Sequence, residues 1–247
     1  MAVTLAENTL RNDEDQLVLA GLKSVIFLSL FKVRVFKIEG KALKLTLPQV
    51  LKQTLLNDGL IGIRRFRPDD VPLLLDAVHE SVNELCTFMT WCRRDYSLAD
   101  SRTFIARCDS DWEKGERYNF AIVDPTDKIL VGSVGLNRID RAHNFAHIGY
   151  WVRRTRTGHG VATSATRLVA SFGLKELGFH RLEILVPGNN AASQRVAQKA
   201  GAKFEGTLRK RLVLSDGLHD AFLYSLVPAD LALPVSRSMA TTAASPA

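Results

Sequence analysis

Apolar residues follow two spacings along the chain, and from residue 60 onward the change between them separates strands from helices. Residues 61–66 have the composition of a strand. A helix is predicted to begin at Pro68, since Asp69 and Asp70 suit a first turn and apolar residues then recur at helical spacing. These recurring residues are Leu73, Leu74, Ala77 and Val78. The region therefore predicts a strand that leads into a helix.

The next segment predicts a second helix followed by three strands. Ser97 and Asp100 have the spacing of a capping box, and the helix that they begin should end near Gly115. Strands are predicted at residues 118–123, 129–134 and 145–152, with a turn at 125–128 between the first two. Their short connections indicate an antiparallel meander.

The last third alternates between helices and strands. Apolar spacing predicts a helix from Val161 to Phe172, a strand at 181–186 and a helix at 191–200 that Gly201 can cap. A hairpin around the Asp216-Gly217 turn follows. The fold class is therefore mixed α+β, with a mixed sheet and helices on both of its faces.

Length and composition indicate one sizeable domain with extensions. The 247 residues are 46% hydrophobic and 24% charged, which is typical of a soluble globular protein. Residues 57–228 form the predicted domain, and 229–247 form a flexible tail rich in Ala, Thr and Ser. Residues 1–56 show no single period, so they are either a loosely attached extension or an arm for dimer formation or partner binding.

Charge and cysteine content narrow the class of partner. Lys and Arg number 33 against 26 Asp and Glu, a net charge of +7, which favours anionic ligands such as phosphates or RNA. Three cysteines without a Cys-x-x-Cys pair argue against a disulfide framework or a zinc knuckle, and no metal-binding motif is present. The longest apolar stretch, 25–31, is too short to span a membrane, so we expect a cytoplasmic protein.

The most informative stretch is residues 149–163, where a strand ends in a polar loop that runs directly into a helix. Gly158 and Gly160 let the backbone approach a ligand, and the N–H groups of the first helical turn offer donors to a phosphate. The loop does not end in Gly-Lys-Ser/Thr, and Thr163 stands where a dinucleotide motif needs glycine. The pattern thus indicates a cradle for an anion, although a tight structural connection is the alternative.

Several spaced motifs resemble the GNAT superfamily of N-acetyltransferases, and in particular its RimJ/RimL branch, which acetylates ribosomal-protein N-termini. The resemblance covers residues 60–228. Its motifs, in chain order, are Trp91-Cys92, Tyr96-Ser97, Ile148-Gly-Tyr-Trp-Val152, Gly158-His-Gly-Val-Ala-Thr163, Pro187-Gly-Asn-Asn190, Ser193 and Gly201-Ala-Lys-Phe-Glu-Gly206.

The resemblance implies acetyl-CoA as the donor and a sheet that splays between the strands at 145–152 and 181–186. The pantetheine arm would pair with main-chain groups of residues 152–154, and the diphosphate would rest on the N–H groups of 157–162. Thr157 replaces the Arg or Gln usual in the family. The cofactor-binding residues implied are Trp151, Val152, Arg153, Arg154, Arg156, Thr157, Gly158, His159, Gly160, Val161, Ala162, Thr163, Asn190 and Ser193.

The same resemblance suggests the catalytic groups. Ser193 is the candidate proton donor to the departing thiolate, and its alternative is an exposed serine in the first helical turn. Asn190 would hold the pantetheine arm, act as a helix N-cap, or do both. A backbone N–H near Val152 would stabilise the oxyanion. His147 stands where the branch often carries Glu, and its ordinary pKa suits a general base, although a structural role is the alternative.

The expected function is transfer of an acetyl group from acetyl-CoA to a primary amine, by direct attack in a ternary complex. The acceptor would be a protein N-terminus, as in ribosomal proteins, or a small amine. The residues implied at its pocket are Trp91, Tyr96 and Tyr150, and core packing is the alternative for Trp91.

The competing hypothesis is an inactive module that binds acyl-CoA or RNA. Arg209, Lys210 and Arg211 are either a solvated face or a contact for an acidic partner or RNA.

Overall fold

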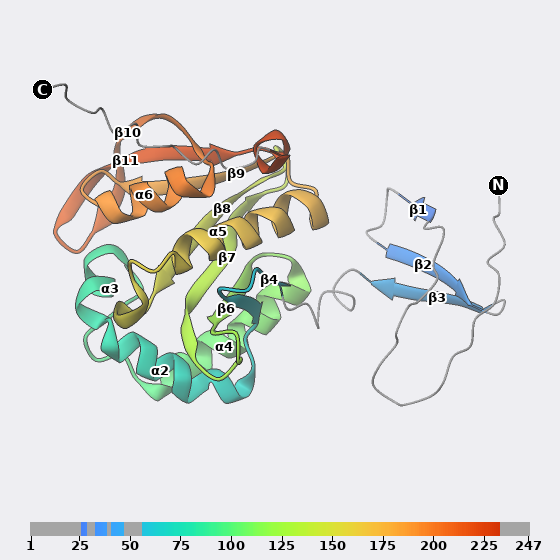
Figure 1. Cartoon of the computed structure of the whole chain (residues 1–247), viewed down its shortest axis with the longest axis horizontal. Helices are drawn as coiled ribbons and strands as arrows, with labels where there is room; N and C mark the ends of the chain where they lie inside the picture. Colours follow the sequence, from blue (N-terminus) through green and yellow to red (C-terminus); the bar gives the residue numbers. More distant parts are fainter. Residues whose placement is uncertain (1–25, 29–32, 39–40, 47–55, 233–247) are drawn as a thin grey trace, which may run out of the picture. The chain divides into compact units, whose positions relative to one another are not determined.

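The computed structural model describes residues 26–28, 33–38, 41–46 and 56–232, and divides the chain into two units, Met1–Thr54 and Leu55–Ala247. In the first unit the described residues form a three-stranded antiparallel sheet of β1 (Ile26–Leu28), β2 (Val33–Ile38) and β3 (Lys41–Thr46) (Figure 1). The sequence predicted no element there. Most of the expected tail, from residue 233, lies outside the described residues.

The second unit is built on an eight-stranded sheet with the order β10-β11-β9-β8-β7-β6-β5-β4. All neighbours are antiparallel except β8 and β9, which are parallel. The strands are β4 (Leu56–Asn57), β5 (Gly62–Arg65), β6 (Tyr118–Val123), β7 (Leu130–Asp140), β8 (Phe145–Val152), β9 (Arg181–Pro187), β10 (Lys203–Leu214) and β11 (Gly217–Leu226).

Helices cover both faces of this sheet, which confirms the predicted architecture (Figure 1). Ala121 of β6 and Trp151 of β8 belong to the core that packs with α2 (Val71–Glu80), α3 (Val82–Phe88) and α4 (Leu98–Lys114). On the opposite face, Phe120 contacts the ring of Phe172, directly after α5 (Val161–Ser171). Side chains alternate across a strand, so neighbouring residues of β6 serve the two cores. The remaining elements are α6 (Ala191–Ala200), η1 (Pro68–Asp70), η2 (Arg154–Arg156), η3 (Phe172–Glu176) and η4 (Pro228–Ala232).

Local signals set the helix ends where the sequence predicted them. The Ser97 Oγ accepts a bond from the N–H of Asp100, and the Asp100 carboxylate accepts one from the N–H of Ser97 at 2.9 Å, so α4 begins with a capping box. Gly115 and Gly201 end α4 and α6 in the left-handed conformation. The sequence missed α3 and ended β7 at residue 134, whereas that strand continues to Asp140.

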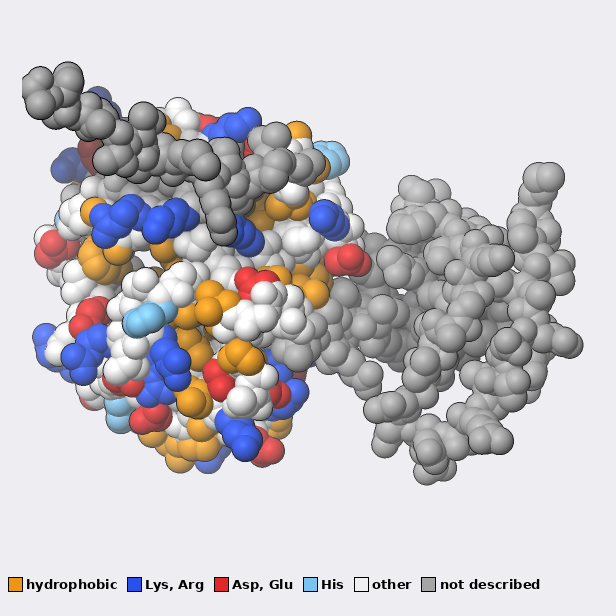
Figure 2. All heavy atoms as spheres, viewed as in Figure 1, with side chains coloured by type: hydrophobic (Ala, Val, Ile, Leu, Met, Phe, Trp, Pro, Cys, Tyr) orange, Lys and Arg blue, Asp and Glu red, His pale blue; other side chains and the backbone are white. Residues whose placement is uncertain are grey.

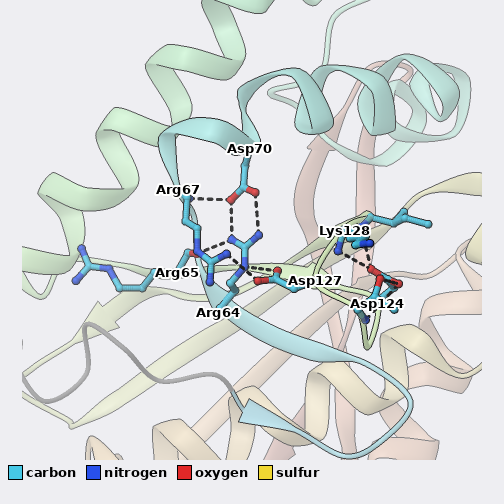
Figure 3. Close-up of polar contacts among 9 residues, drawn as sticks. Arg64, Arg65, Arg67, Asp70, Asp124, Asp127 and Lys128 are labelled. Atoms are coloured by element: carbon cyan, nitrogen blue, oxygen red, sulfur yellow. Dashed lines mark hydrogen bonds and ion pairs between the residues drawn. The ribbon is translucent and has the colours of Figure 1, made fainter. Parts of the chain in front are cut away.

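A buried ion pair ties the start of the domain together (Figure 3). Arg64 of β5 donates two bonds to Asp70 of η1, at 2.7 and 2.9 Å, and a third to Asp127 in the turn between β6 and β7, at 2.6 Å. The Asp70 carboxylate also accepts the main-chain N–H of Arg67 at 2.7 Å. Both oxygens of Asp70 are therefore used within the protein.

The described residues contain neither a membrane-spanning helix nor a metal-binding cluster. Among them no helix is long and apolar enough to cross a membrane. In the same part of the chain no group of His, Cys, Asp and Glu side chains is arranged to hold a metal ion.

Candidate active site

Strands β8 and β9 run side by side only at their beginnings. Phe145 to His147 pair with Arg181 to Glu183, after which β8 continues to Val152 and β9 to Pro187 with no pairing between them. The two strands therefore leave an open gap in the middle of the sheet. This confirms the splayed strands that the family resemblance implied.

Beyond His147, main-chain groups of β8 point into the gap at every second residue. The Arg153 N–H donates to the Val131 carbonyl on the β7 side, at 2.8 Å. Because successive residues of a strand point their main-chain groups to opposite sides, those of Val152 face the gap. The Arg154 N–H is bonded to the Ser81 Oγ at 2.9 Å, so it is not free to pair with a ligand. The pairing of a ligand with residues 152–154 stays a prediction.

The loop before α5 has the geometry of an anion cradle. Gly158 and Gly160 take φ of 81° and 83°, a left-handed conformation that favours glycine. Gly160 is the N-cap of α5 and no side chain caps this helix. Within the described residues the N–H groups of 158–163 have no acceptor, so the first turn offers its donors and its positive helix end to a ligand.

Glu80 of α2 holds the beginning of this loop. One carboxylate oxygen accepts from Arg153 Nε at 2.8 Å, and the other accepts from both the N–H and the hydroxyl of Thr155, each at 2.8 Å. The bond from Arg153 lowers the pKa of Glu80 to about 2. Arg153 also pairs with Asp76 at 2.7 Å, so its charge is held by α2. Arg154 and Arg156 are exposed and form no ion pair with a described residue.

A second carboxylate, that of Asp58, contacts the first turns of α5. Asp58, in the turn between β4 and β5, bonds with the Ser164 hydroxyl in the first turns of α5. Burial would raise the pKa of Asp58, but the bonds from Ser164, Ile61 and Leu60 lower it. A Cβ on Gly160 would lie 3.6 Å from Leu60.

Figure 2 shows a hollow between α6 and the loop before α5, with Lys and Arg side chains along α6.

Ser193, in the first turn of α6, is joined to β8 by a tyrosine. The Asn190 Oδ1 accepts the Ser193 N–H at 3.0 Å, which confirms Asn190 as the helix N-cap. The Tyr150 hydroxyl lies 2.8 Å from the Ser193 Oγ and 3.2 Å from the Ser193 carbonyl. Burial raises the pKa of Tyr150 to about 12. Tyr150, expected at the acceptor pocket, thus supports Ser193, a link that only the fold reveals.

His147 lies where the gap begins. Its Nε2 accepts the main-chain N–H of Leu185 at 3.2 Å. Burial, followed by the charges of Arg138 and Arg211, lowers the pKa of His147 to about 4. The role of general base stays a prediction. The geometry argues against it, because the nitrogen that would take up the proton already accepts the Leu185 N–H.

Trp91 and Tyr96, the other two aromatic residues expected at the acceptor pocket, differ in burial. Trp91 is 44% exposed, and its ring centroid lies 6.2 Å from that of Trp151 and 5.9 Å from that of Tyr96. Tyr96 is buried, with its hydroxyl 3.4 Å from that of Ser101. Trp91 is therefore at the surface beside β8, and the core-packing alternative for it is wrong, whereas Tyr96 belongs to the core.

Comparisons with known proteins agree with this geometry. The model of the acetyltransferase (GNAT) domain family matches residues 61–203. The "Probable N-acetyltransferase YjcK" of Bacillus subtilis is 35% identical over 136 residues, which are 55% of this chain and 75% of that protein. The "Ribosomal-protein-serine acetyltransferase" of Escherichia coli is 29% identical over 98 residues, which are 40% of this chain and 55% of that protein. RimJ of Mycobacterium smegmatis, solved with CoA-disulfide, has a TM-score of 0.66 at 24% identity, covering 71% of this chain and 85% of that one.

Proposed function

The chain belongs to the acetyltransferase (GNAT) family and is an acetyl-CoA-dependent N-acetyltransferase, and we propose that its acceptor is the N-terminal α-amine of a protein. The observation that carries the transfer from acetyl-CoA is the gap between β8 and β9, which opens beside a helix start whose N–H groups have no partner in the described part of the chain. The similarity to a protein named as a ribosomal-protein-serine acetyltransferase supports a protein acceptor.

The residues present fit acetyl-CoA, which supplies an acetyl thioester when bound. The N–H groups of 158–163 and the exposed Arg154 and Arg156 would hold the diphosphate. The main chain of Val152 would line the pantetheine arm in the gap, where β9 offers no competing pair. Ser193 and Asn190, which caps α6, would contact the arm from the start of that helix.

The catalytic roles follow from these positions. The N–H of Val152 would stabilise the negative charge that develops on the carbonyl oxygen, because it faces the gap and has no partner from β9. Ser193 would donate a proton to the departing thiolate, and Tyr150 would hold the serine hydroxyl at 2.8 Å in the correct rotamer. The proton of the attacking amine would leave through water.

The proposed function is tested by measuring release of free thiol from acetyl-CoA in the presence of a panel of peptides and small amines. We expect turnover with peptides that carry a free α-amine and none with the same peptides blocked at the N-terminus. Turnover with small amines alone would contradict the proposed acceptor. Tight binding of acetyl-CoA in titration calorimetry without turnover on any acceptor would instead indicate an inactive acyl-CoA-binding module.

The role of Ser193 is tested by Ser193→Ala. We expect kcat to fall about 100-fold, since a positioned acid typically contributes at least that much, with the Kd of acetyl-CoA unchanged. Tyr150→Phe removes only the supporting hydroxyl and should lower kcat less. Ser215→Ala, in the exposed turn between β10 and β11, is the matched control. Unchanged kcat in Ser193→Ala would rule out the proton-donor role.

A further inference from the structure

The gap between β8 and β9 begins at a single side chain. Main-chain pairing ends at His147 and Glu183, and the next main-chain donor that β9 directs toward β8 is the N–H of Leu185, two residues on. In a continued ladder a carbonyl of β8 would accept it. Here the imidazole Nε2 of His147 accepts it instead, at 3.2 Å.

We propose that His147 is a positioning residue that keeps β8 and β9 apart by satisfying the Leu185 N–H with its side chain. This inference rests on the proposed function, because the gap matters as the site of the acyl donor. An unpaired N–H inside the sheet is costly, so the strand edge needs an acceptor. A side chain supplies one while holding the two backbones farther apart than a main-chain bond would.

The surroundings of His147 keep the ring neutral and fix its tautomer. Arg138 in the bulge of β7 and Arg211 in the bulge of β10 bring positive charge toward it, and burial acts in the same direction. Glu183, the pairing partner on β9, is bonded to Arg181 at 2.9 Å. Since Nε2 accepts a bond, the single proton of the neutral ring is on Nδ1. The link to Leu185 is therefore intact throughout the neutral pH range.

The same geometry separates positioning from general-base catalysis. To take a proton at Nε2 the ring would have to give up the Leu185 N–H and become a cation near two arginines. A positioning role requires only an acceptor atom at the place of Nε2. Gln offers this atom, because its Oε1 is as many bonds from Cβ as Nε2 is, whereas the Asn oxygen corresponds to Nδ1.

The experiment compares His147→Gln with His147→Asn. In the Gln variant we expect kcat/KM and the acetyl-CoA Kd within about threefold of the unmodified protein, and the same pH profile between pH 6 and 9. In the Asn variant we expect the acetyl-CoA Kd to rise about tenfold, the effect of one unsatisfied N–H. Thermal unfolding of both variants checks that each is folded.

Hydrogen exchange at the Leu185 amide gives a readout that does not depend on activity. We expect protection in the unmodified and Gln proteins and at least tenfold faster exchange in the Asn protein. Equal exchange in all three would overturn the inference even if no acceptor is ever acetylated. A loss of 100-fold or more in kcat in the Gln variant, with the acetyl-CoA Kd unchanged, would overturn it in favour of a general base.

Discussion

Two arginine–carboxylate clusters in this protein use the same chemistry in different surroundings. Arg64 and Asp70 are almost fully buried, with side chains 6% and 3% exposed, and join β5 to η1. Arg153 and Glu80 are 13% and 17% exposed and join α2 to the loop before α5. The first cluster lies within the packed core, while the second borders a loop whose later N–H groups have no acceptor among the described residues.

The difference shows that an arginine–carboxylate pair can stabilise the fold in one place and position a ligand-binding loop in another. Both oxygens of Asp70 are used to hold the fold, since Arg64 and the Arg67 N–H share them. Glu80 also uses both oxygens, but what it fixes is the backbone that leads to an anion cradle. Loss of Asp70 should therefore change stability, and loss of Glu80 should change ligand binding.

The largest effect is expected for Asp70→Asn. This change leaves Arg64 buried with only Asp127 as a charged partner, so the free energy of unfolding should fall by about 3 kcal/mol. Urea denaturation measures it, and the acetyl-CoA Kd of the folded variant should stay as it was. A loss below about 1 kcal/mol would mean that the buried pair is not a main support of the domain.

The next effect is expected for Glu80→Gln. Without the charge, Arg153 and Thr155 are held less firmly and the KM of acetyl-CoA should rise about tenfold, roughly the effect of one charge-assisted bond. S-acetylpantetheine lacks the diphosphate, so its kcat/KM should change much less. An equal loss with both donors would contradict a role specific to the diphosphate loop.

The pH dependence of stability offers a second readout for this variant. The folded-state pKa of Glu80, about 2, lies below its ordinary value of 4.5. Its contribution is therefore complete above about pH 4.5 and is lost as the pH falls toward 2. The unmodified protein should lose more stability over that interval than Glu80→Gln does, as acid titrations followed by circular dichroism would measure.

The smallest effect is expected for Asp58→Asn. The Asp58 carboxylate lies near the start of α5 and repels a bound diphosphate, while the amide of Asn can still accept the Ser164 hydroxyl. Acetyl-CoA should bind about two- to threefold more tightly at low salt, and the gain should vanish at about 1 M salt because charges are then screened. Weaker binding would show that Asp58 supports the helix start more than it opposes the ligand.

Residues that act on near neighbours in sequence could be predicted. Ser97 and Asp100 mark the start of α4 because a capping box involves residues only three apart. Gly158 and Gly160 indicated the cradle because glycine before a helix lets the backbone adopt a left-handed conformation and approach a ligand. The opening between β8 and β9 came from the family resemblance, since the periodicity of a strand does not say where its pairing ends.

Contacts between distant segments could not be predicted. Nothing near Glu80 signals that it will hold Arg153, 73 residues later, and Asp58 and Ser164 are 106 residues apart. His147 shows the same limit, because its residue type suits a base and only the position of the Leu185 N–H reveals another role. The type of a residue predicts which chemistry its side chain can perform, whereas the fold determines which group that side chain contacts.

The central claim is that acetyl-CoA lies between β8 and β9 with its diphosphate on the start of α5. Backbone-amide NMR during titration with acetyl-CoA tests it most directly. The account predicts the largest shifts at the amides of Val152 and residues 158–163, with little change around Arg64 and Asp70. Saturable binding that leaves those amides unmoved and shifts others would contradict it.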